Sequence, residues 1–345
     1  MKRRTAKGAA STFAPPAPSG ICGGNQKKAA KFERRLLKYE ELPEYLKDNE
    51  FIRDYYRCEW PLKDAALSLF CLHNETLNIW THLIGFLIFL GLTVMSLTEK
   101  TTFEHGIAIF LGEGKDGWLK TKMMNQSNGC SAFFQDSYSG TTIPLPMWPW
   151  LVFLTGSMCC LVTSAVSHLL SCHSIGLCYL LWRLDYAGIS LMIVSSFFAP
   201  VYYVFYDHPV CLLLYLSSIA ILGVLATATL LAPALSTAQF RPLRAALFLC
   251  MGFSGVVPAA HAALLHWGTH PHVRASLAYE ALMGVLYGLG AAFYVARVPE
   301  RWRPGAFDVV GHSHQIFHVF VVAAALVHCA ATLTIMEWRR GLLGA

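Results

Sequence analysis

Seven stretches of about 20 mainly apolar residues dominate the hydropathy pattern of the chain. None of them has Lys or Arg in its interior, and they cover residues 77–97, 149–171, 184–206, 210–232, 245–266, 276–296 and 309–335. At a rise of about 1.5 Å per residue, roughly 20 apolar helical residues cross the hydrocarbon core of a bilayer. The pattern therefore predicts an all-α, polytopic membrane protein built as a seven-transmembrane helix bundle.

The segments outside these stretches predict the remaining organisation of the chain. Residues 1–30 are basic and rich in Ala, Pro, Ser and Gly, a composition typical of a disordered arm. Residues 31–76 contain two short amphipathic stretches, which we expect to form cytoplasmic or interfacial helices. The bundle then occupies residues 77–335, with a long outer loop at 98–148 that contains a possible glycosylation site at Asn125, and a short outer tail at 336–345.

Composition and charge support this class and give an orientation. Hydrophobic residues make up 55% of the chain and charged residues 14%, and the mean hydropathy is +0.44, which excludes an ordinary soluble domain. The net charge of +6 does not point to a nucleic-acid partner, because the apolar bulk makes the lipid bilayer the main partner. Of the 27 Lys and Arg residues, 20 lie on the side of the amino terminus. The positive-inside rule then predicts a cytoplasmic amino terminus and an extracytoplasmic carboxy terminus, the reverse of a G-protein-coupled receptor.

This orientation brings four potential metal ligands to one depth of the membrane. His168 lies in the last turn of the second span, which runs inward. Asp185 is expected in the first turn of the third span, and His314 and His318 in the first turns of the seventh, both of which run outward. Ionisable side chains inside a membrane are costly and usually functional. We therefore expect a polar centre in the cytoplasmic third of the bundle.

The spacing of His314 and His318 suggests a metal site. Residues four apart share one helix face, about 6 Å apart along the axis, so both imidazoles can reach one ion. Two hydrogen-bonded packing histidines are the alternative, and His168 and Asp185 at the same depth favour the metal. Three imidazoles with a nearby carboxylate suit zinc. Three protein ligands leave a position for a water nucleophile, which Asp185 could orient or deprotonate.

Other polar residues have two interpretations. Ser164 either bonds a carbonyl of its own helix or steadies the water or a substrate carbonyl. Cys172 could compete as a ligand, although an inert interfacial thiol is the simpler interpretation. His312 is expected at the interface, and His328 in the outer half of the seventh span, where packing or a hydrogen bond to a neighbouring helix is its default role. The sequence also predicts a kink in the fifth span at Pro258.

Several segments together resemble the progestin and adipoQ receptor family, which includes the adiponectin receptors, and most closely its plant heptahelical branch. These segments are LKDNEFIRDYYR, HNETLNIWTHLIGF, SAVSHLLSCHS, RLDYAGIS, FSGVVP and ARVPERWRPGAFDVVGHSHQIFHVFVV. The resemblance implies zinc held by His168, His314 and His318, with Asp185 reaching it through water and Ser164 as the serine of the family motif. It does not imply adiponectin as the ligand, because the 98–148 loop is longer than in the animal receptors and the tail is short.

The resemblance leaves two functions open for an integral, multi-pass membrane protein. One is a receptor-like role in hormone, nutrient or stress signalling, with a hormone-related ligand, a cytoplasmic signalling partner and zinc as a structural clamp. The other is a zinc-dependent amide hydrolase of the ceramidase type, with a ceramide-like lipid as substrate. A transporter is the least supported, since neither broken-helix repeats nor paired charges across the midplane are evident. The sequence does not distinguish the plasma membrane from an endomembrane.

Overall fold

A computed structural model describes residues 33–98, 145–232, 238–268 and 270–343, and in this part of the chain every regular element is a helix. An isolated β-bridge joins Leu37 and Tyr56. The arm predicted at residues 1–30, most of the predicted outer loop and the possible glycosylation site at Asn125 lie outside the described residues.

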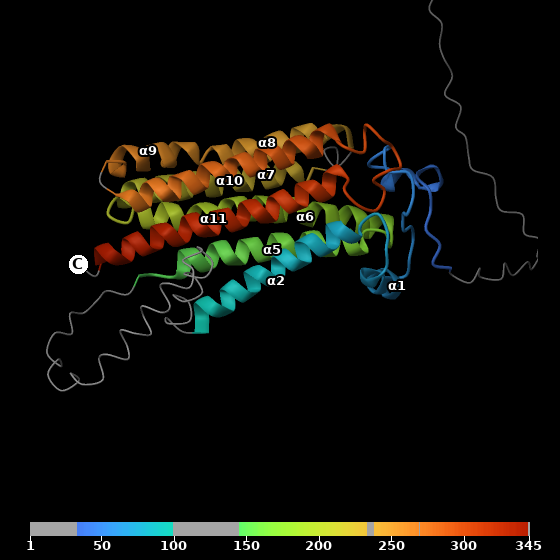
Figure 1. Ribbon diagram of the computed structural model, residues 1–345, viewed down its shortest axis with the longest axis horizontal. Coiled ribbons are helices and arrows are strands. Elements are labelled where there is room, and N and C mark those ends of the chain that lie inside the picture. Colours follow the sequence, from blue (N-terminus) through green and yellow to red (C-terminus); the bar gives the residue numbers. More distant parts are fainter. Residues whose placement is uncertain (1–32, 99–144, 233–237, 269, 344–345) are drawn as a thin grey trace, which may run out of the picture. The chain divides into compact units, whose positions relative to one another are not determined.

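The described residues contain seven spans long and apolar enough to cross a membrane, which confirms the predicted fold class (Figure 1). The protein is thus an integral, multi-pass membrane protein. Four of the spans begin with a proline in their first turn, where the missing N–H would have no intrahelical partner. The spans are α2 (Thr76–Thr98), α5 (Trp148–Leu170), α6 (Ile175–Val204), α7 (Pro209–Leu230), α8 (Arg241–Phe253) together with α9 (Val256–His266), α10 (Pro271–Ala296) and α11 (Ser313–Leu343).

Two helices form the centre of the bundle. The apolar windows of α11 and α5 are 67% and 56% buried, against 17% for α7, so α11 and α5 are inner helices and α7 faces lipid. The helix α11 packs against α10, α2 and α6, while α5 packs against α2 and α6 (Figure 1). Every residue of the metal centre predicted above lies on α5, α6 or α11, which are in contact around this core.

Prolines shape two of the spans by removing hydrogen-bond donors. The fifth span is divided into α8 and α9 at Ser254, the residue four before Pro258. Pro258 has no N–H to donate, and the Ser254 carbonyl accepts instead from the N–H of Val257 at 3.2 Å. The helix is therefore interrupted next to the proline at which the kink was predicted. In α6, Pro200 frees the carbonyl of Ser196 in the same way, and His328 Nε2 of α11 donates to that oxygen at 3.0 Å. A hydrogen bond between helices thus replaces the one that the proline removes.

The structure differs from the sequence-based boundaries in two spans. The helix α6 begins at Ile175, so Asp185 lies ten residues into the helix and not in its first turn. Arg183 therefore lies within the helix and not in the connection before it. The helix α11 runs on to Leu343, so most of the segment expected as a tail is helical.

The segment before the first span is mainly irregular. Two single-turn 3-10 helices, η1 (Tyr39–Glu41) and η2 (Glu44–Leu46), stand where one amphipathic helix was expected, and Pro43 separates them. A small apolar cluster of Leu42, Ile52 and Tyr56 holds this segment together. The short helix α1 (Leu62–Leu67) and the turn η3 (Ser68–Phe70) then lead to α2. In Figure 1 this segment, drawn in blue, lies at the end of the bundle where α11 begins.

Candidate metal centre

Three histidines from two helices converge where α5 ends and α11 begins, which we call the histidine cluster. His168 lies in the last turn of α5, and His314 and His318 lie in the first two turns of α11. His168 and His318 are buried, with 1% and 2% of their surface exposed. One ring nitrogen of each residue can be chosen so that all three lie within 4.8 Å of one another. The cluster could hold a metal ion.

The geometry of the three rings fits a small cation. Their centroids form a nearly equilateral triangle with sides of 4.8, 4.8 and 5.0 Å. Nε2 of His168 and Nε2 of His314 are 3.3 Å apart. Two nitrogens that bind tetrahedral zinc at roughly 2.0–2.1 Å are about 3.3 Å from each other. This pair therefore already has the spacing of two zinc ligands.

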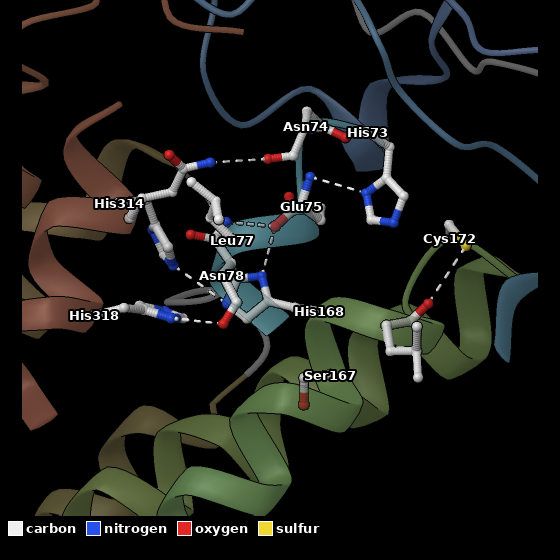
Figure 2. A network of polar contacts seen from close by, with 12 residues as sticks. His73, Asn74, Glu75, Leu77, Asn78, Ser167, His168, Cys172, His314 and His318 are labelled. Carbon is white, nitrogen blue, oxygen red and sulfur yellow. Dashed lines mark hydrogen bonds and ion pairs between the residues drawn. The ribbon is translucent and has the colours of Figure 1, made fainter. Parts of the chain in front are cut away.

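The outward-facing nitrogens of two rings are held by protein groups (Figure 2). His168 Nδ1 lies 2.7 Å from Glu75 Oε2, and His318 Nδ1 lies 3.1 Å from the main-chain oxygen of Asn78. Each Nδ1 thus has an acceptor for its proton, which leaves Nε2 unprotonated and free to bind a cation. Glu75 Oε2 also accepts a hydrogen bond from the side-chain amide of Asn78. Glu75 is therefore the acceptor that the neutral ring of His168 needs.

Asp185 and Ser164 lie beside the cluster without joining it. Asp185 is buried on α6, and its carboxylate is not among the groups that approach one another within ligand distance. The hydroxyl of Ser164, one turn before His168 on α5, is within hydrogen-bonding reach of this carboxylate. Oδ1 of Asp185 is buried and has no hydrogen-bond partner among the described residues. Because a buried carboxylate oxygen requires a partner, this oxygen fits a neighbouring cation or a water bound to it.

Other candidate residues from the sequence lie outside the cluster. Cys172 is buried between α5 and α6, and burial raises the pKa of its thiol, which disfavours the thiolate that binds metals. His312 is buried and its Nε2 lies 3.2 Å from the oxygen of Asn74, so it is not an exposed interfacial residue. His328 bonds to Ser196 on α6 and to Glu280 on α10, as its predicted role between helices requires.

Sequence reasoning did not assign a role to the face of α2 that covers the cluster. Glu75, Asn78 and His82 are spaced i, i+3 and i+7, so they share one face of a helix. His82 is buried and its ring stacks on that of His318, with centroids 3.6 Å apart and planes 4° from parallel. This polar spacing at the start of the first span, at the same depth as His168, was the signal that could have identified them.

A large cavity opens on to the cluster. It has a volume of about 1320 Å³ and is lined by His168, Asp185, His314 and His318 as well as by residues of the other half of the bundle, such as Glu280 and Ile335. A cavity of this size exceeds a typical small-molecule pocket and can accept an extended amphiphile. The histidine cluster and the Asp185 carboxylate are therefore accessible to a ligand inside the bundle.

Comparison with known proteins identifies relatives across nearly the whole chain. Residues 70–329 match the haemolysin-III-related family. Heptahelical transmembrane protein 3 of Arabidopsis thaliana is 53% identical over 98% of this chain and 97% of the relative. Heptahelical transmembrane protein ADIPOR1 of Oryza sativa subsp. japonica is 47% identical over 89% of this chain and 86% of the relative. The adiponectin receptor protein of Drosophila melanogaster is 37% identical over 85% of this chain and 58% of the relative.

Proposed function

The chain belongs to the haemolysin-III-related family, which is the progestin and adipoQ receptor family of the sequence resemblance, and we propose that it is a receptor with an intramembrane zinc centre formed by His168, His314 and His318. The zinc holds α5 against α11. The amino terminus lies in the cytoplasm. A hormone-related or lipid ligand enters the cavity and alters the contact between α5 and α11, and this alteration is passed to a cytoplasmic signalling partner. The name of the Drosophila relative, a receptor protein, supports the receptor role.

The observation that carries this proposal is the 3.3 Å separation of two Nε2 atoms on different helices. Two neutral imidazoles could share one hydrogen bond at that distance, but a third imidazole also points at the pair. The outward nitrogens of His168 and His318 both face acceptors, so both inward nitrogens have lone pairs, and a single proton on His314 Nε2 can satisfy only one of them. A cation is the group that satisfies converging lone pairs of this kind.

Metal content of the purified protein tests the zinc centre. We expect about one zinc per chain in the wild type, and a large loss of zinc in His314→Ala, because three imidazoles are needed for tight binding. His272→Ala is the matched control, since His272 is an exposed histidine of α10 outside the cluster. A wild-type protein without zinc, or equal zinc in His314→Ala and the control, would contradict the proposal.

A second candidate function, hydrolysis of a lipid amide such as ceramide, is favoured by the partnerless Oδ1 of Asp185 beside the cavity. Zinc held by the three histidines would supply a water of lowered pKa, near 7. Asp185 would take a proton from the water whose oxygen forms the new bond to the amide carbon, and would return that proton to the amine nitrogen as the C–N bond breaks. Ser164 would hold the orientation of the Asp185 carboxylate. The products are a fatty acid and a sphingoid amine.

Release of fatty acid from a labelled ceramide, compared between wild type and Asp185→Asn, tests the hydrolase. The expected outcome is loss of release in Asp185→Asn with zinc content unchanged, because Asp185 moves the proton but does not bind the metal. If both proteins release fatty acid at the same rate, or if neither does so, the hydrolase is excluded and zinc serves as a clamp alone.

A further inference from the structure

Glu75 lies at the entry of α2 and is fixed in place from two sides. Its Oε2 lies 2.7 Å from His168 Nδ1 and also accepts a hydrogen bond of 2.5 Å from the side-chain amide of Asn78. Its main-chain N–H donates to Nδ1 of His73 at 3.1 Å (Figure 2). The carboxylate is therefore held against His168 by neighbours of its own segment, and only 27% of its side chain is exposed.

A carboxylate at this position determines how His168 presents its ring. Because Glu75 accepts a proton from Nδ1, the neutral ring carries that proton on Nδ1 and a lone pair on Nε2, and Nε2 is the atom 3.3 Å from His314. The hydrogen bond also fixes rotation about χ2, which decides whether Nε2 faces the cluster. The negative charge raises the basicity of the ring as a ligand.

The same two turns of α2 hold a second ligand ring. The carbonyl of Asn78 accepts a hydrogen bond from His318 Nδ1 at 3.1 Å. The ring of His82 stacks face to face on the ring of His318. Neither α2 nor Glu75, the residue before it, belongs to the cluster of three histidines, yet Glu75 and Asn78 contact the outward nitrogens of two of them. The face formed by Glu75, Asn78 and His82 is thus a supporting layer for the cluster.

We infer that Glu75 is a positioning residue of the metal centre, whose carboxylate fixes the tautomer and ring orientation of His168 for binding. This inference rests on the proposed zinc centre. Glu75 itself remains outside the group of ligand atoms, because its oxygen is bonded to Nδ1, the nitrogen on the far side of the ring. The loss of this carboxylate weakens binding through His168 and leaves all three ligands present.

Metal affinity of purified Glu75→Ala and Glu75→Gln, measured by competition with a chromophoric chelator, tests the inference. We expect zinc affinity to fall about 10- to 100-fold in Glu75→Ala, and less in Glu75→Gln, whose neutral amide oxygen still accepts from Nδ1. Cobalt(II) serves as a spectroscopic probe of geometry. We expect its visible absorption to change in Glu75→Ala and to approach the wild-type spectrum in Glu75→Gln.

Glu280→Ala is the matched control, because Glu280 and His328 form the same kind of pair, a carboxylate oxygen 3.0 Å from Nδ1, away from the cluster. Glu280→Ala should keep wild-type zinc affinity and a wild-type cobalt spectrum. Unchanged affinity in Glu75→Ala, or equal losses in Glu75→Ala and Glu280→Ala, would overturn the inference while the zinc centre stands. If Glu75→Ala does not fold, a zinc affinity of Glu75→Gln equal to that of the wild type overturns it. Absence of zinc from the wild type would overturn the centre itself.

Discussion

Arg57 donates hydrogen bonds from its guanidinium to the main-chain oxygens of His168, at 2.7 Å, and Leu169, at 2.8 Å. These are among the last carbonyls of α5, which have no intrahelical donor, and a cation there also interacts favourably with the helix dipole. Arg57 is 3% exposed and bonds to Ser68 as well. The segment before the first span is therefore tied directly to the helix end that carries His168.

Replacement of Arg57 is expected to lower both stability and metal affinity. Arg57→Ala removes charge-assisted hydrogen bonds worth about 1.5–3 kcal/mol each and leaves buried carbonyls without donors. We expect a loss of about 3 kcal/mol in unfolding free energy, with weaker zinc binding because the end of α5 is released. Arg57→Lys should recover only part of this, because an ammonium cannot donate in the fork geometry of a guanidinium.

Thermal unfolding in detergent, with and without added zinc, measures this effect. Arg53→Ala is the control, since the Arg53 side chain is 47% exposed and its ion pair with Glu40 is solvated. Such a pair contributes less than about 1 kcal/mol. Equal melting temperatures for Arg57→Ala and Arg53→Ala would show that the bonds to α5 contribute nothing.

The pairing of His328 with the carbonyl freed by Pro200 gives a second prediction. His328→Ala leaves the oxygen of Ser196 without its donor and Glu280 without its partner, and we expect a loss of about 3 kcal/mol. Pro200→Ala restores an N–H that can donate to Ser196 within α6. The double variant should therefore be more stable than the sum of the two single changes predicts.

A double-mutant cycle of melting temperatures and unfolding free energies measures this coupling. The energy that remains lost in the double variant reports the unpaired Glu280. Strictly additive effects of His328→Ala and Pro200→Ala would mean that the bond to Ser196 does not compensate for the proline.

The histidine cluster could be predicted from the sequence because its ligands obey helix periodicity. His314 and His318 share a face at any helix register, and span direction alone brings His168 to their depth. The spacing of Glu75, Asn78 and His82 could have identified a polar face, but the pairing of Glu75 with His168 could not be predicted, since it depends on the rotation of α2 about its axis. That rotation is set by packing of α2 against α5 and α11, which no local pattern encodes. The same limit applies to Arg57, whose partners are main-chain atoms 111 and 112 residues away.

The fold could be predicted from hydropathy because it also depends on local sequence patterns. The number of spans and the break at Pro258 follow from local chemistry, namely apolar length and a missing N–H. The ends of the spans were less well defined, because helix extends beyond the predicted apolar stretches, back to Ile175 in α6 and on to Leu343 in α11. Hydropathy marks where a helix is apolar, and hydrogen bonding decides where it ends.

His73 predicts a dependence of stability on pH. It is buried before α2, its Nε2 lies 3.2 Å from the oxygen of Ser68, and its Nδ1 accepts from the N–H of Glu75, an arrangement that requires a neutral ring. Burial, aided by the nearby charge of Arg57 and opposed by that of Glu75, lowers the pKa of His73 to about 3.

The unfolded state therefore binds a proton at His73 between about pH 6.5 and pH 3 while the folded state does not. The contribution of neutral His73 to the unfolding free energy is complete above pH 6.5. It is lost as the pH falls, by up to about 1.4 kcal/mol per pH unit. His73→Gln keeps a donor and an acceptor but does not titrate. We expect the wild type to lose unfolding free energy relative to this variant as the pH falls from 6.5 towards 3. A difference that does not depend on pH would contradict the prediction.

The close approach of α5 and α6 at Gly156 gives the last prediction. A Cβ added to Gly156 would lie 1.9 Å from Oγ and 2.6 Å from Cβ of Ser195, far inside contact distance. Ser195 is itself buried and cannot swing away, so Gly156→Ala must push the two helices apart and with them the elements that carry His168 and Asp185.

A Cβ at Gly91 on α2 would meet no atom within 4 Å, which makes Gly91→Ala the matched control. We expect Gly156→Ala to lower the melting temperature and zinc affinity, and Gly91→Ala to leave both unchanged or slightly higher, since alanine favours helix. Ser195→Gly in the Gly156→Ala background removes the clashing Cβ and Oγ and should restore part of the stability. If it restores none, the cost of Gly156→Ala arises elsewhere than in the contact between α5 and α6.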